Sequence, residues 1–596
     1  MLKRVLVTLA LLFAGPLCIS GRVFADAVPV ELRQTETGWQ LYRDGEPYFI
    51  RGAGGDGSLE RLAAAGANST RTWSTDGAGQ ALDEALALGM TVTVGIWLGH
   101  ERHGFDYGDP GQVAAQRQAA REAVLKYKDH PALLLWGVGN EAEGFDSGDD
   151  PAIWTAINDV AAMIKELDPH HPTMTVTAEI GGGRIESLHT NSPAIDIHGV
   201  NAYGGAASVG KRLREGGATK PYVIAEFGPV GPWEMPTTDW GAPYEGTSTQ
   251  KADFYRQAYE KAVLGAAGQA LGSYAFLWGH KMEGTATWFG MMLDSGAKVG
   301  ALDVMTEVWS GAPPDDLCPT IEPIEIDTAT ELDPGALITA SVSVSDPEGG
   351  ATTLHWFLRP ESGEYATGGD FKRAPEAIED SVVSSTANKA TIRMPDAPGQ
   401  YRLFAYAYDE AGNAATANIP LLVKGEVRPR MPFAVYTDGF EAMPWVPSGW
   451  MGGIDSLTLD GAYADEVHDG SAAIRMRYTG TYGWVGVAWQ HPANNWGEQD
   501  GGFDLTGATA LELWAKGEYG GEKVTFGVGL LEQGRAHPDS TIAKTDTIEL
   551  TSEWQRFRIG LEGRDLTSLK TGFVVTLQGR TSSVTAYLDS IRFIRE

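Results

Sequence analysis

Cysteine is scarce in this chain of 596 residues, and its scarcity excludes one class of protein. The two cysteines are Cys18 and Cys318, and Cys18 lies in an N-terminal stretch that we expect to be cleaved off. A single remaining cysteine cannot form an internal disulfide bond. The chain is therefore not a small secreted scaffold held together by disulfides.

Positive charge is also in short supply. Lysine and arginine number 46 against 78 aspartates and glutamates, which gives a net charge of −32 and a pI near 4.7. Such a surface repels nucleic acid and anionic membranes, so we expect neither as a partner. A neutral polymer such as a polysaccharide is not repelled by this charge.

Long apolar runs are absent after the N-terminus. Residues 5–18 are apolar but too short to span a bilayer comfortably; they follow two basic residues and precede small residues near Ala25. We predict that residues 1–25 are a signal peptide, that the protein is secreted or periplasmic in a bacterium, and that no part inserts in a membrane after cleavage. A lipoprotein anchor on Cys18 is the weaker alternative, because bulky Leu17 precedes it.

The first half of the chain alternates between short β-rich runs and segments with helical spacing. The β-rich runs are 47–54, 67–73, 90–98, 132–141, 172–179, 194–203, 221–228 and 272–279. Eight such units predict a (β/α)8 TIM barrel over residues 26–314. An open doubly wound sheet is the alternative, but "GAGGDGS" at 52–58 does not fit its G-x-G-x-x-G phosphate loop.

Two further domains, both rich in β-strands, are predicted after the barrel. A Pro-rich linker at 310–320 precedes segments that alternate with a period of two, which predicts an Ig-like β-sandwich spacer over residues 315–427. A second linker, "GEVRPRMP", leads into more strand-like segments. Their number and length predict a jelly roll over residues 428–596.

Polar and aromatic side chains stand at the ends of the eight predicted strands. In a TIM barrel, the carboxyl ends of the strands form the active site. The side chains at these ends are Arg71 and Trp73, Trp97 and His100, Asn140 and Glu141, Glu179, Asn201 and Tyr203, Glu226, and Trp278. This set contains no dense His/Asp cluster, no nucleophilic serine and no phosphate loop, so no cofactor is expected for catalysis.

Glu141 and Glu226 end the fourth and seventh strands, so they face each other across the predicted barrel mouth. Cleavage of a glycosidic bond needs such a pair, with one carboxyl group to protonate the leaving oxygen and one to attack the anomeric carbon. The two environments must differ, so that one group holds a proton while the other is ionised. Arg71 and Tyr203 are placed to donate to Glu226 and keep it anionic.

The motifs "WGVGNEAE" and "VIAEFG" resemble glycoside hydrolase clan A, whose members are retaining hydrolases with a (β/α)8 barrel. The resemblance covers the barrel, about half of the chain. It implies that Glu141 is the acid/base and Glu226 the nucleophile. It also implies that Asn140 holds the sugar 2-hydroxyl and that Tyr203 bonds to the nucleophile.

Other positions follow the clan's pattern less uniformly. Arg71 matches the clan's second-strand arginine and Trp278 its eighth-strand aromatic. Asn201 departs from the common His-x-Tyr of the sixth strand. For Trp73, Trp97 and Trp278, packing in the core is the alternative to contact with sugar.

The opening "GWQLYRDGEPYFIRGAG" looks like that of family 2 barrel domains and of β-1,3-glucanosyltransferases. This likeness implies a β-glucan substrate, with β-1,3-glucan favoured. The domains that precede the barrel in full family 2 enzymes are absent, so an ordinary β-galactosidase is not expected. A β-glucan transglycosylase with the same site, or a glycan-binding surface protein without activity, are the alternatives.

The last domain resembles carbohydrate-binding jelly rolls. That resemblance implies a structural Ca²⁺ held by Asp438, Glu441 and Asp589, since Ca²⁺ takes oxygen ligands; surface acids near the chain ends are the alternative. Trp484, Trp489 and Trp496 lie close together in sequence. They make either a platform for sugar or part of the sandwich core.

Overall fold

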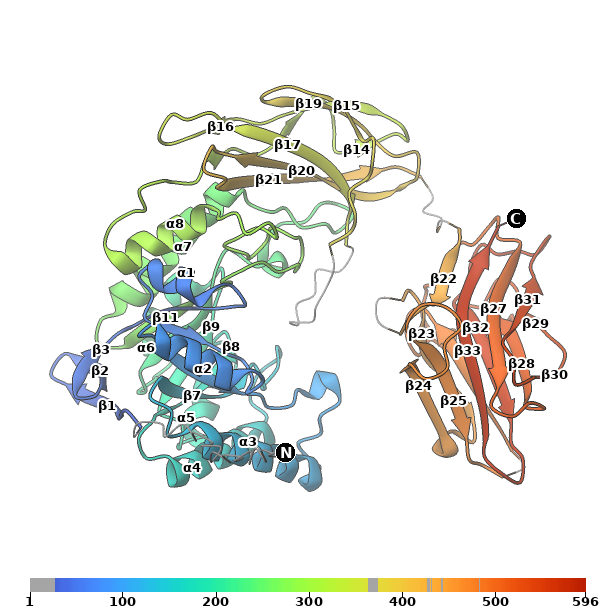
Figure 1. The fold of residues 1–596 in the computed structure, drawn as a ribbon, viewed down its shortest axis with the longest axis horizontal. Helices are drawn as coiled ribbons and strands as arrows, with labels where there is room; N and C mark the ends of the chain where they lie inside the picture. Colours follow the sequence, from blue (N-terminus) through green and yellow to red (C-terminus); the bar gives the residue numbers. More distant parts are fainter. Residues whose placement is uncertain are drawn as a thin grey trace, which may run out of the picture. The chain divides into compact units, whose positions relative to one another are not determined.

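The computed structural model describes residues 27–362, 374–425, 429, 431–440, 443–481 and 483–595 (Figure 1). The signal peptide predicted for residues 1–25 lies outside the described residues, as does Glu441. No helix among the described residues combines the length and the apolar character needed to cross a bilayer.

The barrel predicted from the sequence is confirmed. Eight parallel strands close on themselves in the order β10-β11-β4-β5-β6-β7-β8-β9. Their bounds are β4 (Ile50–Gly54), β5 (Ser69–Arg71), β6 (Thr91–Ile96), β7 (Leu133–Asn140), β8 (Thr173–Ala178), β9 (Ile197–Asn201), β10 (Tyr222–Phe227) and β11 (Ala270–Phe276). Each strand lies within one of the β-rich runs or overlaps it. Strands such as β7 are nearly continuous apolar segments, as expected for parallel strands buried on both faces.

Helices surround the strands, and several begin at signals that are visible in the sequence. They are α1 (Leu59–Ala64), α2 (Ala78–Ala87), α3 (Pro110–Tyr127), α4 (Pro151–Leu167), α5 (Arg184–Asn191), α6 (Val209–Glu215), α7 (Ser248–Ala258) and α8 (Gly300–Ser310). Helices α3 and α4 each start with an Asp-Pro pair, in which the aspartate accepts a bond from a backbone N–H of the first turn. Helix α7 starts with a capping box between Thr247 and Gln250.

A three-stranded antiparallel sheet precedes the barrel and was not anticipated. It consists of β1 (Val30–Thr35), β2 (Gly38–Arg43) and β3 (Glu46–Tyr48). Val30 and Leu41 join the apolar cluster that fills the barrel interior. The sheet therefore helps to bury the barrel core away from the strand ends that carry the polar side chains.

The Ig-like sandwich follows and belongs to the same compact unit as the barrel, which ends at Leu422. Its main sheets have the orders β13-β15-β19-β18 and β14-β21-β20-β17, and β12 pairs with β16. The bounds are β12 (Thr320–Ile321), β13 (Glu325–Ile326), β14 (Glu331–Leu332), β15 (Leu337–Ser341), β16 (Val344–Ser345), β17 (Thr353–Pro360), β18 (Val382–Ser385), β19 (Lys389–Arg393), β20 (Gly399–Tyr408) and β21 (Ala414–Val423).

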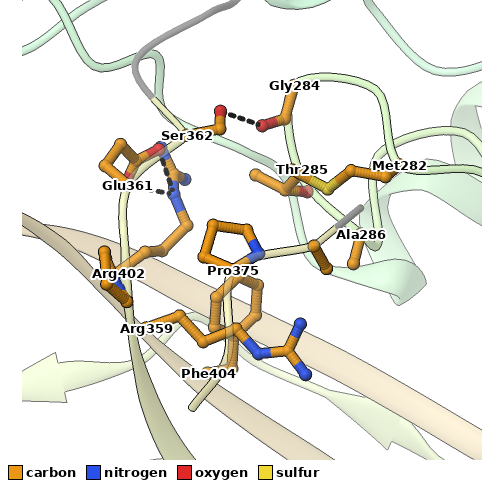
Figure 2. A pocket seen from close by; sticks show the side chains of 12 residues that line it. Met282, Gly284, Thr285, Ala286, Arg359, Glu361, Ser362, Pro375, Arg402 and Phe404 are labelled. Carbon is orange, nitrogen blue, oxygen red and sulfur yellow. Dashed lines mark hydrogen bonds and ion pairs between the residues drawn. The ribbon is translucent and has the colours of Figure 1, made fainter. Parts of the chain in front are cut away.

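Hydrogen bonds join the sandwich to the barrel. A loose spacer would lack such bonds. Arg402 on β20 is buried; it pairs with Glu361 and donates to the Pro243 carbonyl of the barrel at 2.8 Å. Ser362 donates to the carbonyl of Gly284 at 3.1 Å, and a small hollow lined by Met282 and Phe404 lies beside these contacts (Figure 2). The sandwich thus supports the barrel loops that contain Pro243 and Gly284.

A second compact unit begins at Val423 and has the two facing antiparallel sheets expected of a jelly roll. One sheet has the order β24-β25-β33-β27-β31 with β22 beside β33; the other has the order β23-β26-β32-β28-β29 with β30 beside β28. The bounds are β22 (Phe433–Tyr436), β23 (Val446–Gly452), β24 (Leu457–Tyr463), β25 (Ala473–Tyr478), β26 (Trp484–Gln490), β27 (Ala510–Gly517), β28 (Lys523–Val528), β29 (Ala543–Lys544), β30 (Ile548–Glu549), β31 (Gln555–Gly560), β32 (Thr571–Gln578) and β33 (Val584–Ile594).

Loss of Arg402 should destabilise the whole barrel–sandwich unit. We expect Arg402→Ala to lower the free energy of unfolding by about 3–5 kcal/mol, because the change leaves the carboxylate of Glu361 buried without its partner. Denaturant unfolding followed by tryptophan fluorescence measures this. Lys211→Ala is the control, since the exposed Lys211–Glu215 pair contributes at most about 1 kcal/mol. Equal losses in the two variants would contradict the prediction.

Candidate active site

The end of β7 turns sharply, and the turn sets the direction of Glu141. Gly139 has φ +74° and Glu141 has φ +52°, both in the left-handed region. Glycine adopts this conformation freely, whereas glutamate does so at a cost. The backbone N–H of Glu141 donates to the Val176 carbonyl of β8 at 2.8 Å, which fixes the turn.

Arg71 connects the ends of three strands. Its guanidinium is buried and donates to Glu226 Oε1 at 3.1 Å and to the Ala225 carbonyl at 2.8 Å, both on β10. It also donates to Asn140 Oδ1 on β7 at 2.5 Å. One cation from β5 therefore holds both strand ends on which the two candidate carboxylates are placed.

Glu226 is surrounded by hydrogen-bond donors. Besides Arg71, the indole Nε1 of Trp73 donates to Oε1 at 2.7 Å, and the hydroxyl of Tyr203 donates to Oε2 at 2.8 Å. Burial and the nearby charge of Glu226 raise the pKa of Tyr203 well above its ordinary value, so this hydroxyl keeps its proton. This donor set suits an ionised carboxylate.

Glu141 has a different environment. It accepts one hydrogen bond, from Asn201 Nδ2 at 2.8 Å, and the same amide also donates to Asn140 Oδ1 at 3.2 Å. Burial, and then repulsion by the charge of Glu226, raise the pKa of Glu141 to about 7. Near neutral pH this carboxyl group can therefore hold and release a proton, as a general acid/base must.

Two further acids near the mouth are tied into ion pairs. Glu143 is buried; it accepts from Arg184 Nε at 2.9 Å and from the Ala178 backbone N–H at 2.8 Å, which links the loop after β7 to β8. Burial raises the pKa of Glu143. Glu179, at the end of β8, pairs with Arg212 at 2.7 Å. Glu143 and Glu179 are each paired with an arginine of their own and not with a second carboxylate.

The structure contradicts the placement of Trp278 at the sugar site. Trp278 is only 1% exposed; it donates to the Ser58 carbonyl at 3.0 Å and packs beside Trp309. The aromatic residue of β11 at the mouth is Phe276, whose ring lies 6.1 Å from Trp73 and 6.0 Å from Tyr203. The strand β11 ends at Phe276, and the chain then turns. The sequence alone placed the strand end at Trp278, so the prediction assigned the wrong aromatic ring to the mouth.

The loops after the strands bring further aromatic side chains to this region. Trp97 is 42% exposed and stacks on His100. Phe289 and Trp233 pack around Tyr203, with centroids 5.2 and 5.4 Å from its ring. Neither residue was predicted at the site from the sequence. For Trp233 the signal was its loop, residues 228–245, which holds a second tryptophan; for Phe289 there was none.

Two of the three acids predicted to bind Ca²⁺ accept backbone hydrogen bonds, and the third, Glu441, lies outside the described residues, so the Ca²⁺ site stays a prediction. Asp438 Oδ1 accepts from the backbone N–H groups of Ser471 and Ala472, and Asp589 Oδ2 accepts from those of His468 and Asp469. Within the described part of the chain, no three His, Cys, Asp or Glu side chains lie close enough to hold a metal ion. The carboxylates of Asp438 and Asp589 hold the loop at 468–472 through these backbone bonds.

The tryptophans of the second unit separate by strand position. Trp489 is fully buried and packs against Phe573 in the sandwich core, which contradicts its place in a sugar platform. Trp484, five residues earlier on the same strand, is exposed. An odd separation puts the two side chains on opposite faces of β26.

Replacing Glu141 should change how stability depends on pH. Its pKa is raised from 4.5 to about 7, so the protonated form stabilises the fold below about pH 4.5 and this contribution is lost as the pH rises through 7. The parent protein should lose this contribution between pH 5 and pH 8, whereas Glu141→Gln has no group to titrate. The free energy of unfolding of Glu141→Gln, relative to that of the parent, should therefore be about 2 kcal/mol higher at pH 8 than at pH 5. Unfolding at both pH values measures this, with exposed Glu186→Gln as control. A gain independent of pH would contradict the assignment.

Comparisons with known proteins give a family match over this site. Residues 81–231 match the model of "Glycosyl hydrolases family 2, TIM barrel domain", a range that contains both carboxylates. A "Probable mannan endo-1,4-beta-mannosidase C" from Aspergillus terreus is 29% identical over 162 residues, which are 23% of this chain and 39% of that protein. The chain thus spans well under half the length of this curated relative.

Solved structures also match about half of the chain. The β-glucuronidase of Ruminococcus gnavus has a TM-score of 0.39 and 15% identity over 48% of this chain and 53% of its own. A glycoside hydrolase family 5 mannosidase from Rhizomucor miehei has a TM-score of 0.35 and 15% identity over 47% of this chain and 97% of its own. The family match agrees with the resemblance to clan A: residues 81–231, which contain both carboxylates, are similar to a family 2 glycosyl hydrolase barrel.

Proposed function

We propose that the protein is a retaining β-glycoside hydrolase that works through a covalent glycosyl-enzyme. The observation that carries the proposal is the contrast between its two carboxylates. Glu226 is held by three donors, while Glu141 accepts one hydrogen bond and has a pKa of about 7. Two acids that differ in this way supply a nucleophile and a proton donor at the same pH.

The reaction takes two steps. In the first, a Glu226 oxygen bonds to the anomeric carbon, the glycosidic bond breaks, and Glu141 gives its proton to the leaving oxygen. In the second, the Glu141 carboxylate removes a proton from water, and the resulting oxygen displaces Glu226 from the anomeric carbon. Two inversions retain the β-configuration. A sugar hydroxyl in place of water would make the enzyme a transglycosylase.

The surrounding residues orient the groups that react. Tyr203, Trp73 and Arg71 hold Glu226. Asn140 uses its carbonyl oxygen for Arg71 and Asn201, so its amide nitrogen is the atom that can bond to the sugar 2-hydroxyl. Asn201, which replaces the usual histidine, contacts the acid/base directly.

The proposed substrate is a β-linked polymer of neutral hexoses. The guanidinium of Arg71 is bonded to Glu226 and Asn140. Lys281, whose Nζ lies 5.5 Å from the Phe276 ring, pairs with Glu283 at 2.5 Å. Both cations therefore already have partners other than the carboxylate of a uronic acid. The sequence at residues 38–54, at the start of the barrel domain, favours β-1,3-glucan, whereas the curated relative is named for mannan. Both polymers are candidates.

Export and binding to glycan complete the proposal. The predicted signal peptide would deliver the enzyme to the periplasm or outside the cell, where such polymers occur. The jelly roll would hold the polysaccharide near the barrel and raise its local concentration, and a bound Ca²⁺ would strengthen the fold of that unit.

A panel of substrates tests the activity. The wild-type enzyme should release products from at least one of laminarin, lichenan, cellulose and mannan, and NMR should show the β-anomer as the first product. An α-anomer would exclude retention. If no glycan or aryl β-glycoside is cleaved while one glycan still binds, the protein is a glycan-binding protein instead.

Replacement of the nucleophile gives a sharper test. We expect Glu226→Ala to lower kcat by about a thousandfold or more, because no glycosyl-enzyme can form. Added azide should restore turnover of an aryl β-glycoside and yield an α-glycosyl azide, identified by mass spectrometry and NMR. Glu186→Ala, at an exposed residue of α5, is the control and should keep full activity. Activity in Glu226→Ala without azide would rule out the assignment.

A further inference from the structure

Two exposed tryptophans stand on opposite sides of the barrel mouth. Trp97 directly follows β6, and Trp233 follows β10 in the short helix Pro232–Glu234. In the closed order of the barrel, β6 is the fourth strand from β10 in either direction. The two side chains therefore come from diametrically opposite strands, at the end of the barrel that carries both carboxylates.

Trp233 is fixed in position although it is 50% exposed. Its ring meets Tyr203 edge to face at 5.4 Å and lies 6.1 Å from Phe289. The next residue, Glu234, accepts bonds from the backbone N–H groups of Gly204 at 2.9 Å and Gly231 at 3.3 Å. The indole is thus held beside the tyrosine that contacts Glu226, and little freedom is lost when a ligand packs on it.

Trp97 is held in a comparable way on the other side. Its ring stacks on His100 with a centroid distance of 4.7 Å and an interplanar angle of 10°. His100 is buried, and its Nε2 bonds to the backbone carbonyl of Asn140 at 2.9 Å. Trp97 therefore rests on the strand end that carries Glu141, with 42% of the residue exposed.

Large exposed aromatic side chains beside a polar site indicate that the site binds a ligand with apolar surface. A β-linked hexopyranose has such surface, because its axial hydrogens form a flat apolar face that fits an indole ring. Because Trp97 and Trp233 come from opposite strands of the barrel, a chain of sugars that crosses the carboxylate pair can contact both.

We propose that Trp233 is a sugar-binding residue and that, together with Trp97, it binds units of one polysaccharide chain on both sides of the scissile bond. The proposal rests on the proposed glycosidase function and adds the size of its substrate to it. The enzyme cleaves inside a chain of neutral β-linked hexoses, and the removal of one terminal sugar is not its main reaction.

Kinetics on substrates of different length test this proposal. Trp233→Ala and Trp97→Ala should each lower kcat/KM by about tenfold, equivalent to about 1.4 kcal/mol, on the hexasaccharide of the polymer that is cleaved. Both should stay within about twofold of wild type on the matching aryl monoglycoside. Phe49→Ala is the control, because Phe49 is 38% exposed and directly precedes β4 at the opposite end of the barrel.

A binding measurement separates this inference from the proposed function. In the Glu226→Ala background, adding Trp233→Ala should weaken hexasaccharide binding by about tenfold in calorimetry, and Trp233→Phe should restore most of it. Absence of turnover in the wild type with this loss of binding would refute the proposed function but keep the subsite. Unchanged binding, or equal kinetic losses on long and short substrates, would overturn the inference.

Discussion

The buried guanidinium of Arg71 is the interaction on which the rest of the site depends. It reaches Glu226 on β10 and Asn140 on β7 from the end of β5, so it joins strands that are not neighbours in the barrel. A buried carboxylate without a partner is costly. The cation allows Glu226 to remain charged in the mouth, and that charge in turn helps to raise the pKa of Glu141. The difference between the two acids thus begins with one arginine.

The barrel was predictable because its signals are local and repeated. Every strand of the barrel fell within or overlapped a short β-rich run, and helices such as α3 and α4 showed Asp-Pro starts. The positions of Arg71, Asn140, Asn201 and Tyr203 could be inferred because strand ends in a closed parallel barrel meet at one face. Their hydrogen bonds could not, since these depend on side-chain directions that the pattern does not contain.

The sequence misplaced or missed single side chains, both after strands and within them. Trp278 follows β11 by two residues, and the turn after Phe276 sends its ring into the core. Trp489 could have been placed correctly from the sequence, since Val485 and Val487 face the core of the second unit at the same parity. Trp233 lies in a loop whose shape depends on Glu234 and Gly204, a contact between segments that no local pattern reveals.

The bond between Arg402 and the Pro243 carbonyl has a consequence for the order in which the protein can mature. The two residues are 159 positions apart, and the barrel segment is synthesised first. A nascent chain that ends before Arg402 has all eight barrel strands but lacks the support for the loops on that side of the mouth. Until the sandwich emerges from the ribosome, these loops lack this bond and depend on contacts within the barrel, such as those of Glu245 with Lys251 and Thr287.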